Sequence, residues 1–322
     1  MCKGTKIWCI VATALILIGC MIFGGAMTML KWDFTGLSTN KYETNSYEIT
    51  ENYKNISVVT DTADIVFVSS ENSECSVTCY EQKNAKHSVS VKDDTLVIEV
   101  VDTRKWYEFI GINFGSPKIT VSIPQGEYGA LSIRSDTGDV NIPKGLQFSS
   151  IDISESTGDV TSYASASGSV KVKSSTGDIR IEGISAGALD LSVSTGKVTV
   201  SDVISDGDVT VKVSTGKAIL SGITCKSVIS SGDTGDLTLK NVLMSGGLSI
   251  ERSTGDVSLS GCDAAEIFIE TDTGDVKGTL LTEKVFIVRT DTGRINVPKT
   301  TTGGKCEITT DTGDIRIGIA SE

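Results

Sequence analysis

The tripeptide Asp-Thr-Gly, which forms the catalytic loop of aspartic proteases, occurs five times in this chain. Those enzymes need two such loops facing each other, so that two carboxylates share one proton. Here all copies occupy the same place in a regular repeat, and a charged residue follows each one. We therefore interpret them as turns along one edge of the molecule and not as a protease site. The copies begin at Asp136, Asp233, Asp272, Asp291 and Asp311.

A second catalytic pattern, Gly-x-Ser-x-Gly, occurs at Gly183–Gly187. A serine nucleophile of this kind lies on a strand-to-helix turn and needs a histidine base. The only histidine, His87, lies far upstream of the repeats. Enzymes that cleave polysaccharides are a further alternative, but aromatic residues that could bind sugars do not share a repeat position. We expect no catalytic residues and a protein that is not an enzyme.

The eight cysteines support neither a zinc site nor a disulfide framework. None forms the Cys-x-x-Cys pair that zinc sites typically use. Cys75 and Cys79 would lie on one face of a strand, about 13 Å apart, which is too far for a disulfide. We expect no cofactor.

Acidic residues in the last repeats are the candidates for metal binding. They would gather near the C-terminal end, and calcium favours oxygen clusters of this kind. Stacked carboxylates about 5 Å apart also repel by about 1 kcal/mol per neighbouring pair in water, and Lys197, Lys217 and Arg294 interrupt their series. The sequence leaves open a solvated, self-neutralising edge or weak calcium binding. The candidate ligands are Asp272, Asp275, Asp291, Asp311 and Asp314.

All these residues belong to one internal repeat. A Thr-Gly pair occurs ten times at intervals of 19 or 20 residues, which is typical of a solenoid. Each unit reads as a strand, a tight turn and a second strand, and Asp61–Asp64 is a degenerate eleventh copy. Glycine supplies the positive φ that the third residue of a type II turn needs. The structural turn glycines are Gly138, Gly158, Gly177, Gly196, Gly216, Gly235, Gly255, Gly274, Gly293 and Gly313.

We therefore predict an all-β fold, a parallel β-solenoid of about ten coils with an irregular β cap. Residues 1–30 would form the cytoplasmic N-terminus and anchor, 31–47 a tether, 48–125 the cap and 126–322 the solenoid. The aromatic stretch Trp106–Phe114 is interpreted as a lid over the open end or as a partner contact. The last strand, Ile315–Ile319, is predicted to be an uncovered edge through which the chain could self-associate. Handedness and the number of sheets in each coil remain open.

The N-terminal segment Ile7–Leu30 has 24 uncharged residues. As a helix it would be about 36 Å long, enough to span a bilayer. Lys3 and Lys6 precede it, which favours a cytoplasmic N-terminus and an extracytoplasmic body. Two alternatives are a lipoprotein cleavage box ending at Cys20 and a signal peptide cleaved near Gly24–Ala26. All three alternatives place the body outside the cytoplasm.

The formal net charge is −12, and the residues after Lys31 carry −15 of charge. Phosphate backbones would repel so acidic a body, so nucleic acid is not an expected partner. Anionic lipid surfaces would repel it as well. We therefore expect the chain to contact the membrane through its N-terminal helix and not through its acidic body.

The Ser/Asp-Thr-Gly-Asp-Val/Ile repeats, with the Lys118–Gly126 segment that leads into them, resemble the bacterial "putative adhesin" family of envelope proteins of unknown function. The resemblance covers roughly residues 47–322. It implies a β-solenoid-like body, often a membrane anchor, and no catalytic residues.

We expect a membrane-anchored, extracytoplasmic, adhesin-like binding or structural module of the bacterial cell envelope. Its ligand would be a protein or polymer of the envelope or of another surface. The alternative is a cis-acting accessory or sensor for a neighbouring membrane protein in envelope signalling.

Overall fold

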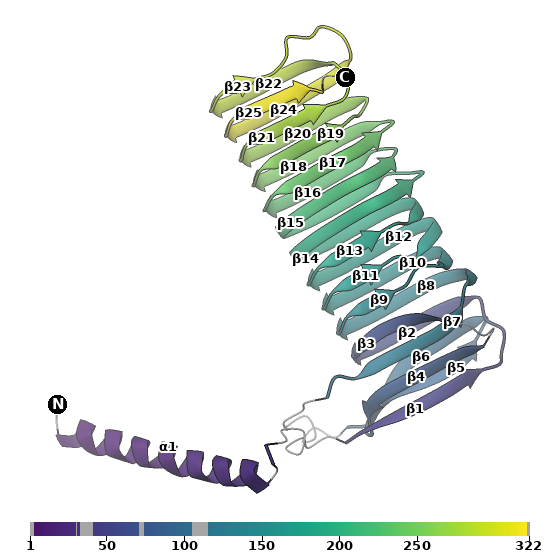
Figure 1. Cartoon of the computed structure of the whole chain (residues 1–322), viewed down its shortest axis with the longest axis vertical. Coiled ribbons are helices and arrows are strands. Elements are labelled where there is room, and N and C mark those ends of the chain that lie inside the picture. Colours follow the sequence, from purple (N-terminus) through teal and green to yellow (C-terminus); the bar gives the residue numbers. More distant parts are fainter. Residues whose placement is uncertain (1–2, 30, 33–40, 71–73, 105–114, 321–322) are drawn as a thin grey trace.

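The computed structural model contains one helix and a long rod of β-strands (Figure 1). It describes residues 3–29, 31–32, 41–70, 74–104 and 115–320. The helix α1 runs from Lys3 to Met29. Its segment Lys6–Met29 has a mean hydropathy of 2.5 and is long enough to cross a membrane. A segment of this kind near an N-terminus serves as a membrane anchor or as a signal sequence.

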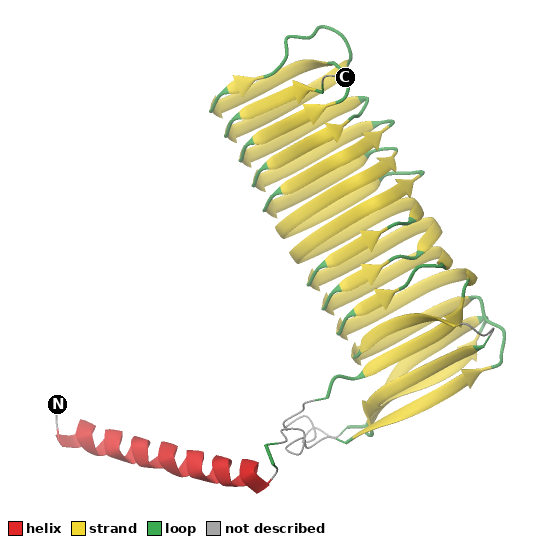
Figure 2. Ribbon diagram, in the orientation of Figure 1, coloured by secondary structure: helices red, strands yellow, loops and turns green. Residues whose placement is uncertain are grey.

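The rod is a parallel β-solenoid with two layers of strands, which confirms the predicted fold class (Figure 2). In each coil, a first-layer strand leads through the turn into the second layer, and strands of neighbouring coils pair in parallel. The degenerate copy is also a coil, because Thr62 pairs with Thr137 in register.

The first layer contains β2 (Asn55–Thr62), β8 (Gly126–Thr137), β10 (Leu146–Thr157), β12 (Ser165–Thr176), β16 (Val228–Thr234), β18 (Gly247–Thr254), β20 (Glu266–Thr273), β22 (Lys284–Thr292) and β24 (Gly304–Thr312). The second layer contains β3 (Asp64–Ser70), β9 (Val140–Ile142), β11 (Val160–Ser162), β13 (Ile179–Glu182), β17 (Leu237–Met244), β19 (Val257–Cys262), β21 (Val276–Leu280), β23 (Ile295–Asn296) and β25 (Ile315–Ile319). The long strands β14 (Ser185–Ser205) and β15 (Val209–Cys225) run through the turn and belong to both layers.

Alternation along each strand sends apolar side chains into the space between the layers. In β12, Val170 and Val172 are buried, whereas Lys171 and Lys173 are exposed. Burying one such aliphatic side chain contributes about 1.5–3 kcal/mol. The same inward positions recur from coil to coil, so one continuous apolar core runs along the rod.

Most of the turn glycines have the predicted positive φ, but Gly274 and Gly293 do not, and the turn is not of type II. Eight of the ten have φ between +132° and +157°, whereas the third residue of a type II turn lies near +80°. The close approach of neighbouring coils adds a second requirement for glycine. A Cβ on Gly177 would lie 1.9 Å from the carbonyl oxygen of Gly158 in the preceding coil.

The coil at the far end of the rod is not the last one in the sequence. β24 pairs with both β20 and β22, and β25 pairs with both β21 and β23 (Figure 1). The chain therefore leaves a gap, forms the end coil with β22 and β23, and returns to fill the gap. The predicted uncovered edge is therefore wrong for Ile315 and Arg316, which pair with β23 as well as with β21, whereas Ile317–Ile319 pair with β21 alone among the described strands. The edge belongs to β22 and β23, where Phe286 and Val288 are only partly buried.

The N-terminal end also departs from sequence order. β6 (Thr95–Asp102) pairs with β2, and β7 (Lys118–Pro124) pairs with β3, on the side away from β8 and β9. Antiparallel strands complete this end: β4 (Cys75–Gln82) pairs with β7, β1 (Tyr42–Ile49) with β4, and β5 (Ala85–Lys92) with β6. The five strands β1, β4, β5, β6 and β7 are called the cap below.

Two segments have a different place from the one that the sequence suggests. Tyr42–Tyr47, expected in the tether, belongs to β1. Asn55–Ser70, expected in the cap, forms a coil of the solenoid because its turn pairs in register with the next one. Residues 33–40 of the expected tether and the aromatic stretch Trp106–Phe114 lie outside the described residues.

Candidate functional site: the turn edge and the outward grooves

The aspartate that follows Thr-Gly joins one coil to the next. Its Oδ1 accepts a hydrogen bond from the backbone N–H of the equivalent residue in the neighbouring coil. Asp139 accepts from Asp159 at 2.9 Å, and Asp159 accepts from Asp178 at 2.7 Å. This series is called the aspartate ladder, and its other acceptors are Asp64, Asp178, Asp236, Asp256, Asp275 and Asp314.

The ladder gives these aspartates a structural role that the sequence did not assign to them. These hydrogen bonds come from the residue after glycine, which the sequence indicated only as part of a solvated edge or of a calcium site.

Two lysines replace aspartate in the middle of the rod. At Lys197 and Lys217 the strands β14 and β15 continue through the turn, and Lys197 pairs directly with Lys217. Lys217 Nζ also forms an ion pair with Asp236 at 3.1 Å, and this contact lowers the pKa of the Asp236 carboxyl. The turn edge therefore carries two positive charges, Lys197 and Lys217, between two acidic stretches.

The five predicted calcium ligands gather at the distal end of this edge. Asp272, Asp311 and Asp291 lie in three successive coils, in that order. Asp275 and Asp314 each accept a ladder hydrogen bond at 2.8 Å. Among the described side chains, no three of these five aspartates have donor atoms within 4.8 Å of one another. Calcium binding at these aspartates stays a prediction.

The two catalytic patterns of the sequence occupy strands and turns. The Asp-Thr-Gly copies lie one above another along the turn edge, each in its own coil, so no two of these loops face each other. Ser185 is the first residue of β14, and a strand follows it where a nucleophile elbow has a helix. The Asp-Thr-Gly copies therefore lack the geometry of an aspartic protease, and Gly183–Gly187 lacks the geometry of a serine nucleophile elbow.

A shallow groove of about 420 Å³ crosses the outward face of β16, β18, β20 and β24. Ile229, Ser249 and Phe268 lie side by side across these strands at outward positions, and Ile229 is 43% exposed. Glu266, Lys305 and Glu307 border the groove. We call this surface the apolar groove. Two pairs of consecutive apolar residues mark this groove in the sequence, in strands whose apolar and polar residues otherwise alternate. The pairs are Val228-Ile229 and Ile267-Phe268.

A second groove of about 360 Å³ lies at the other end of the same layer. Tyr128 and Phe148 stand in neighbouring coils there, with ring centroids 5.7 Å apart. Serines border the two rings, among them Ser149, Ser165 and Ser167. Phe148 is 2% exposed and belongs to the core, and Tyr128 is partly buried against it, so the second depression presents mainly serines to solvent.

A family model described as Toastrack DUF4097 matches residues 53–212 and, a second time, residues 203–322. No curated protein matches the chain. Among solved structures, a putative adhesin from Bacteroides fragilis NCTC 9343 is 18% identical, with 86% of this chain and 97% of that chain covered and a TM-score of 0.42. A putative adhesin from Parabacteroides distasonis ATCC 8503 is 12% identical, with coverage of 87% and 98% and a TM-score of 0.46. A putative lipid binding protein from the same strain is 16% identical, with coverage of 88% and 98% and a TM-score of 0.31.

Proposed function

This chain belongs to the Toastrack DUF4097 family, and from that premise we propose that it is a membrane-anchored, extracytoplasmic binding module of the bacterial cell envelope. It is adhesin-like and non-catalytic. Its ligand is a protein or polymer of the envelope or of another surface. The observation that carries this proposal is a single apolar N-terminal helix joined to a long rod whose outward faces repeat from coil to coil.

The apolar groove is the proposed contact surface. Most outward positions of the first layer carry charged or hydroxyl side chains, such as Lys171, Lys173 and Asp190. Exposed apolar side chains that gather on such a surface mark a site of interaction. The exposed Ile229 and the half-buried Phe268 form this kind of patch, and the charged residues at its border supply polar contacts to a ligand.

The test is photo-crosslinking in living cells. One probe replaces Ser249, between Ile229 and Phe268 in the apolar groove. A second replaces Ser194, which is exposed beside Lys197 on the turn edge. A third, at the exposed Asp202 on the far side of the coil, is the matched control. We expect the Ser249 probe to capture a wall polymer or a surface protein and the control to capture neither.

Capture of one membrane protein of the same cell by the Ser249 and Ser194 probes would overturn this proposal in favour of a cis-acting accessory or sensor. Equal capture by all three probes would show that no face is selective. Anchoring is tested separately by alkaline extraction of membranes. We expect the full chain to stay with the lipid fraction, and release into the soluble fraction would contradict an uncleaved anchor.

A further inference from the structure

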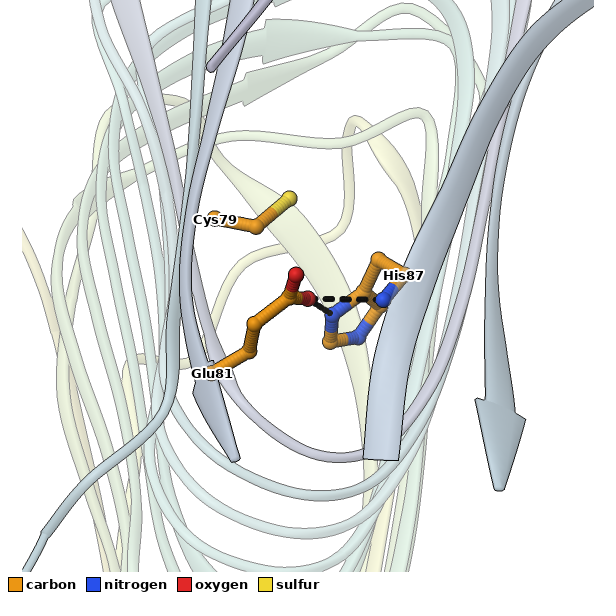
Figure 3. Close-up of side chains that lie close together, drawn as sticks. All are labelled: Cys79, Glu81 and His87. Carbon is orange, nitrogen blue, oxygen red and sulfur yellow. Dashed lines mark hydrogen bonds and ion pairs between the residues drawn. The ribbon is translucent and has the colours of Figure 1, made fainter. Parts of the chain in front are cut away.

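Three potential metal ligands of different chemistry meet inside the cap. Cys79 and Glu81 are two residues apart on β4, so both side chains point into the space between the layers. His87 enters the same space from β5 in the facing layer (Figure 3). One donor atom from each residue lies within 4.8 Å of the other two. Cys79 and Glu81 are 0% exposed and His87 is 4% exposed.

Surrounding groups hold two of these side chains in place. Glu81 Oε1 accepts a hydrogen bond from Asn45 Nδ2 at 2.7 Å, and Glu81 Oε2 accepts one from the His87 backbone N–H at 2.6 Å. On the far side of the imidazole, Nε2 lies 2.9 Å from Thr60 Oγ1. The remaining ring nitrogen, Nδ1, faces Glu81 Oε2 at 2.7 Å. Metal-binding histidines and carboxylates are oriented by outer partners of this kind.

The donor set selects the class of ion. A thiolate, an imidazole nitrogen and a carboxylate oxygen together suit zinc, whereas calcium and magnesium take oxygen ligands. A Zn²⁺ ion bound by one thiolate, one carboxylate and one neutral imidazole gives a site with no net charge, which suits a buried position. Three protein ligands and one water complete a tetrahedral shell.

We propose that Cys79, Glu81 and His87 form a zinc site that fastens the cap to the first coil. The ligands come from β4 and β5, and their outer partners come from β1 and from β2 of the solenoid, so one ion connects four strands. Binding releases the proton of the Cys79 thiol, and the imidazole proton then resides on Nε2, where it is donated to Thr60 Oγ1.

The short spacing of these residues matches no zinc motif, so a zinc site was not expected from the sequence. Cys79 and Glu81 belong to one strand, and only the passage of the chain between layers after Gln82 brings His87 opposite them. The site is independent of the proposed binding function, because it lies in the cap and not on the outward grooves.

The test is metal titration of the full chain in detergent after dialysis against a chelator. We expect one equivalent of Zn²⁺ to bind in competition with a chromophoric chelator, and to raise the melting temperature. Co²⁺ in place of Zn²⁺ should give the near-ultraviolet absorption of a thiolate-to-metal charge transfer. Cys79→Ser should lose this absorption. The matched control Cys75→Ser changes another inward-facing cysteine of β4 and should keep it.

A further variant covers the case in which Cys79→Ser does not fold. Asn45→Ala removes an outer partner of Glu81 without touching a ligand, and should weaken zinc binding about 10- to 100-fold. Failure of the wild-type chain to bind an equivalent of Zn²⁺, or a Co²⁺ complex without thiolate absorption, would overturn the proposal. Unchanged affinity in a folded Cys79→Ser variant would do the same and would leave the cluster as a hydrogen-bonded network.

Discussion

Gly232 leaves the space that the side chain of Arg252 fills from the neighbouring coil. The two residues pair in register, and a Cβ on Gly232 would lie 2.2 Å from Arg252 Nη1. Arg252 is 4% exposed and donates from Nη2 to Ser230 Oγ at 2.8 Å. Its Nε and Nη1 have no acceptor among the described protein atoms. Burial lowers the pKa of this guanidinium, although Asp233 and Asp236 oppose the effect.

We expect Arg252→Met to stabilise the protein by about 1–3 kcal/mol. Methionine fills much of the same space, whereas the guanidinium is buried with two unsatisfied donors, which is costly. Urea unfolding followed by circular dichroism measures the change. Arg134→Met alters an exposed arginine of β8 and should stay within about 0.5 kcal/mol of the wild type. A marked loss of stability in Arg252→Met would mean that the buried charge is needed.

Glu155 makes the stability of the rod depend on pH. Burial, together with the carboxylates of Asp139, Asp159 and Asp64, raises its pKa from 4.5 to about 8. Between these values the folded state keeps a proton that the unfolded chain releases. The contribution of Glu155 to stability is therefore fully present below the lower value and is lost as pH rises, by up to about 1.4 kcal/mol per pH unit, until the upper value is passed.

Glu155→Gln should remove this dependence and stabilise the protein near neutral pH. The measurement is the free energy of unfolding at about pH 5 and about pH 7.5, within the range where the protonation states differ. Glu127→Gln, an exposed substitution in β8, is the control and should keep the wild-type slope. Equal slopes for the wild type and Glu155→Gln would contradict the assignment.

The sequence predicts the coil well because each coil repeats its own local pattern. Strand alternation and the turn at Gly177 depend on residues within one unit, and the same is true of every other unit. The order of coils at the ends depends on long-range pairing, since Thr312 pairs in the same register with Thr273 and with Thr292. The apolar groove was missed for a related reason, because Ile229 and Phe268 become neighbours only through stacking.

Gly177→Ala should destabilise the rod by about 3 kcal/mol or more. Alanine would have to adopt a φ near +140° and would place its Cβ against the carbonyl oxygen of Gly158, so backbone strain and overpacking combine. Gly126→Ala is the control, because a Cβ there meets nothing within 4 Å. The two variants are compared by urea unfolding, and similar midpoints would show that neighbouring coils can separate at the turn.

Asp159→Ala should cost about 1 kcal/mol, because it removes the acceptor of the Asp178 backbone N–H at the turn. Asp159→Asn keeps an oxygen in the same place and should recover most of the loss. Asp190→Ala, at an exposed outward position of β14, serves as the control for removal of a negative charge. If Asp159→Asn is as unstable as Asp159→Ala, the charge and not the hydrogen bond determines the effect.

The free edge of the end coil predicts self-association of the protein. Among the described strands, β22 pairs along its length with β24 alone, and Val285 and Ile287 are 37% and 51% exposed. An exposed apolar edge strand is a template for pairing with another chain. We expect the full chain in detergent to dimerise with rising concentration, and Ile287→Lys to weaken the dimer at least about 10-fold, equivalent to about 1.4 kcal/mol. Sedimentation equilibrium measures both. The control Ile204→Lys removes a comparably exposed isoleucine from β14 and should leave the dimer intact. If the dimer persists in Ile287→Lys, or is lost only in Ile204→Lys, the contact between the chains lies elsewhere.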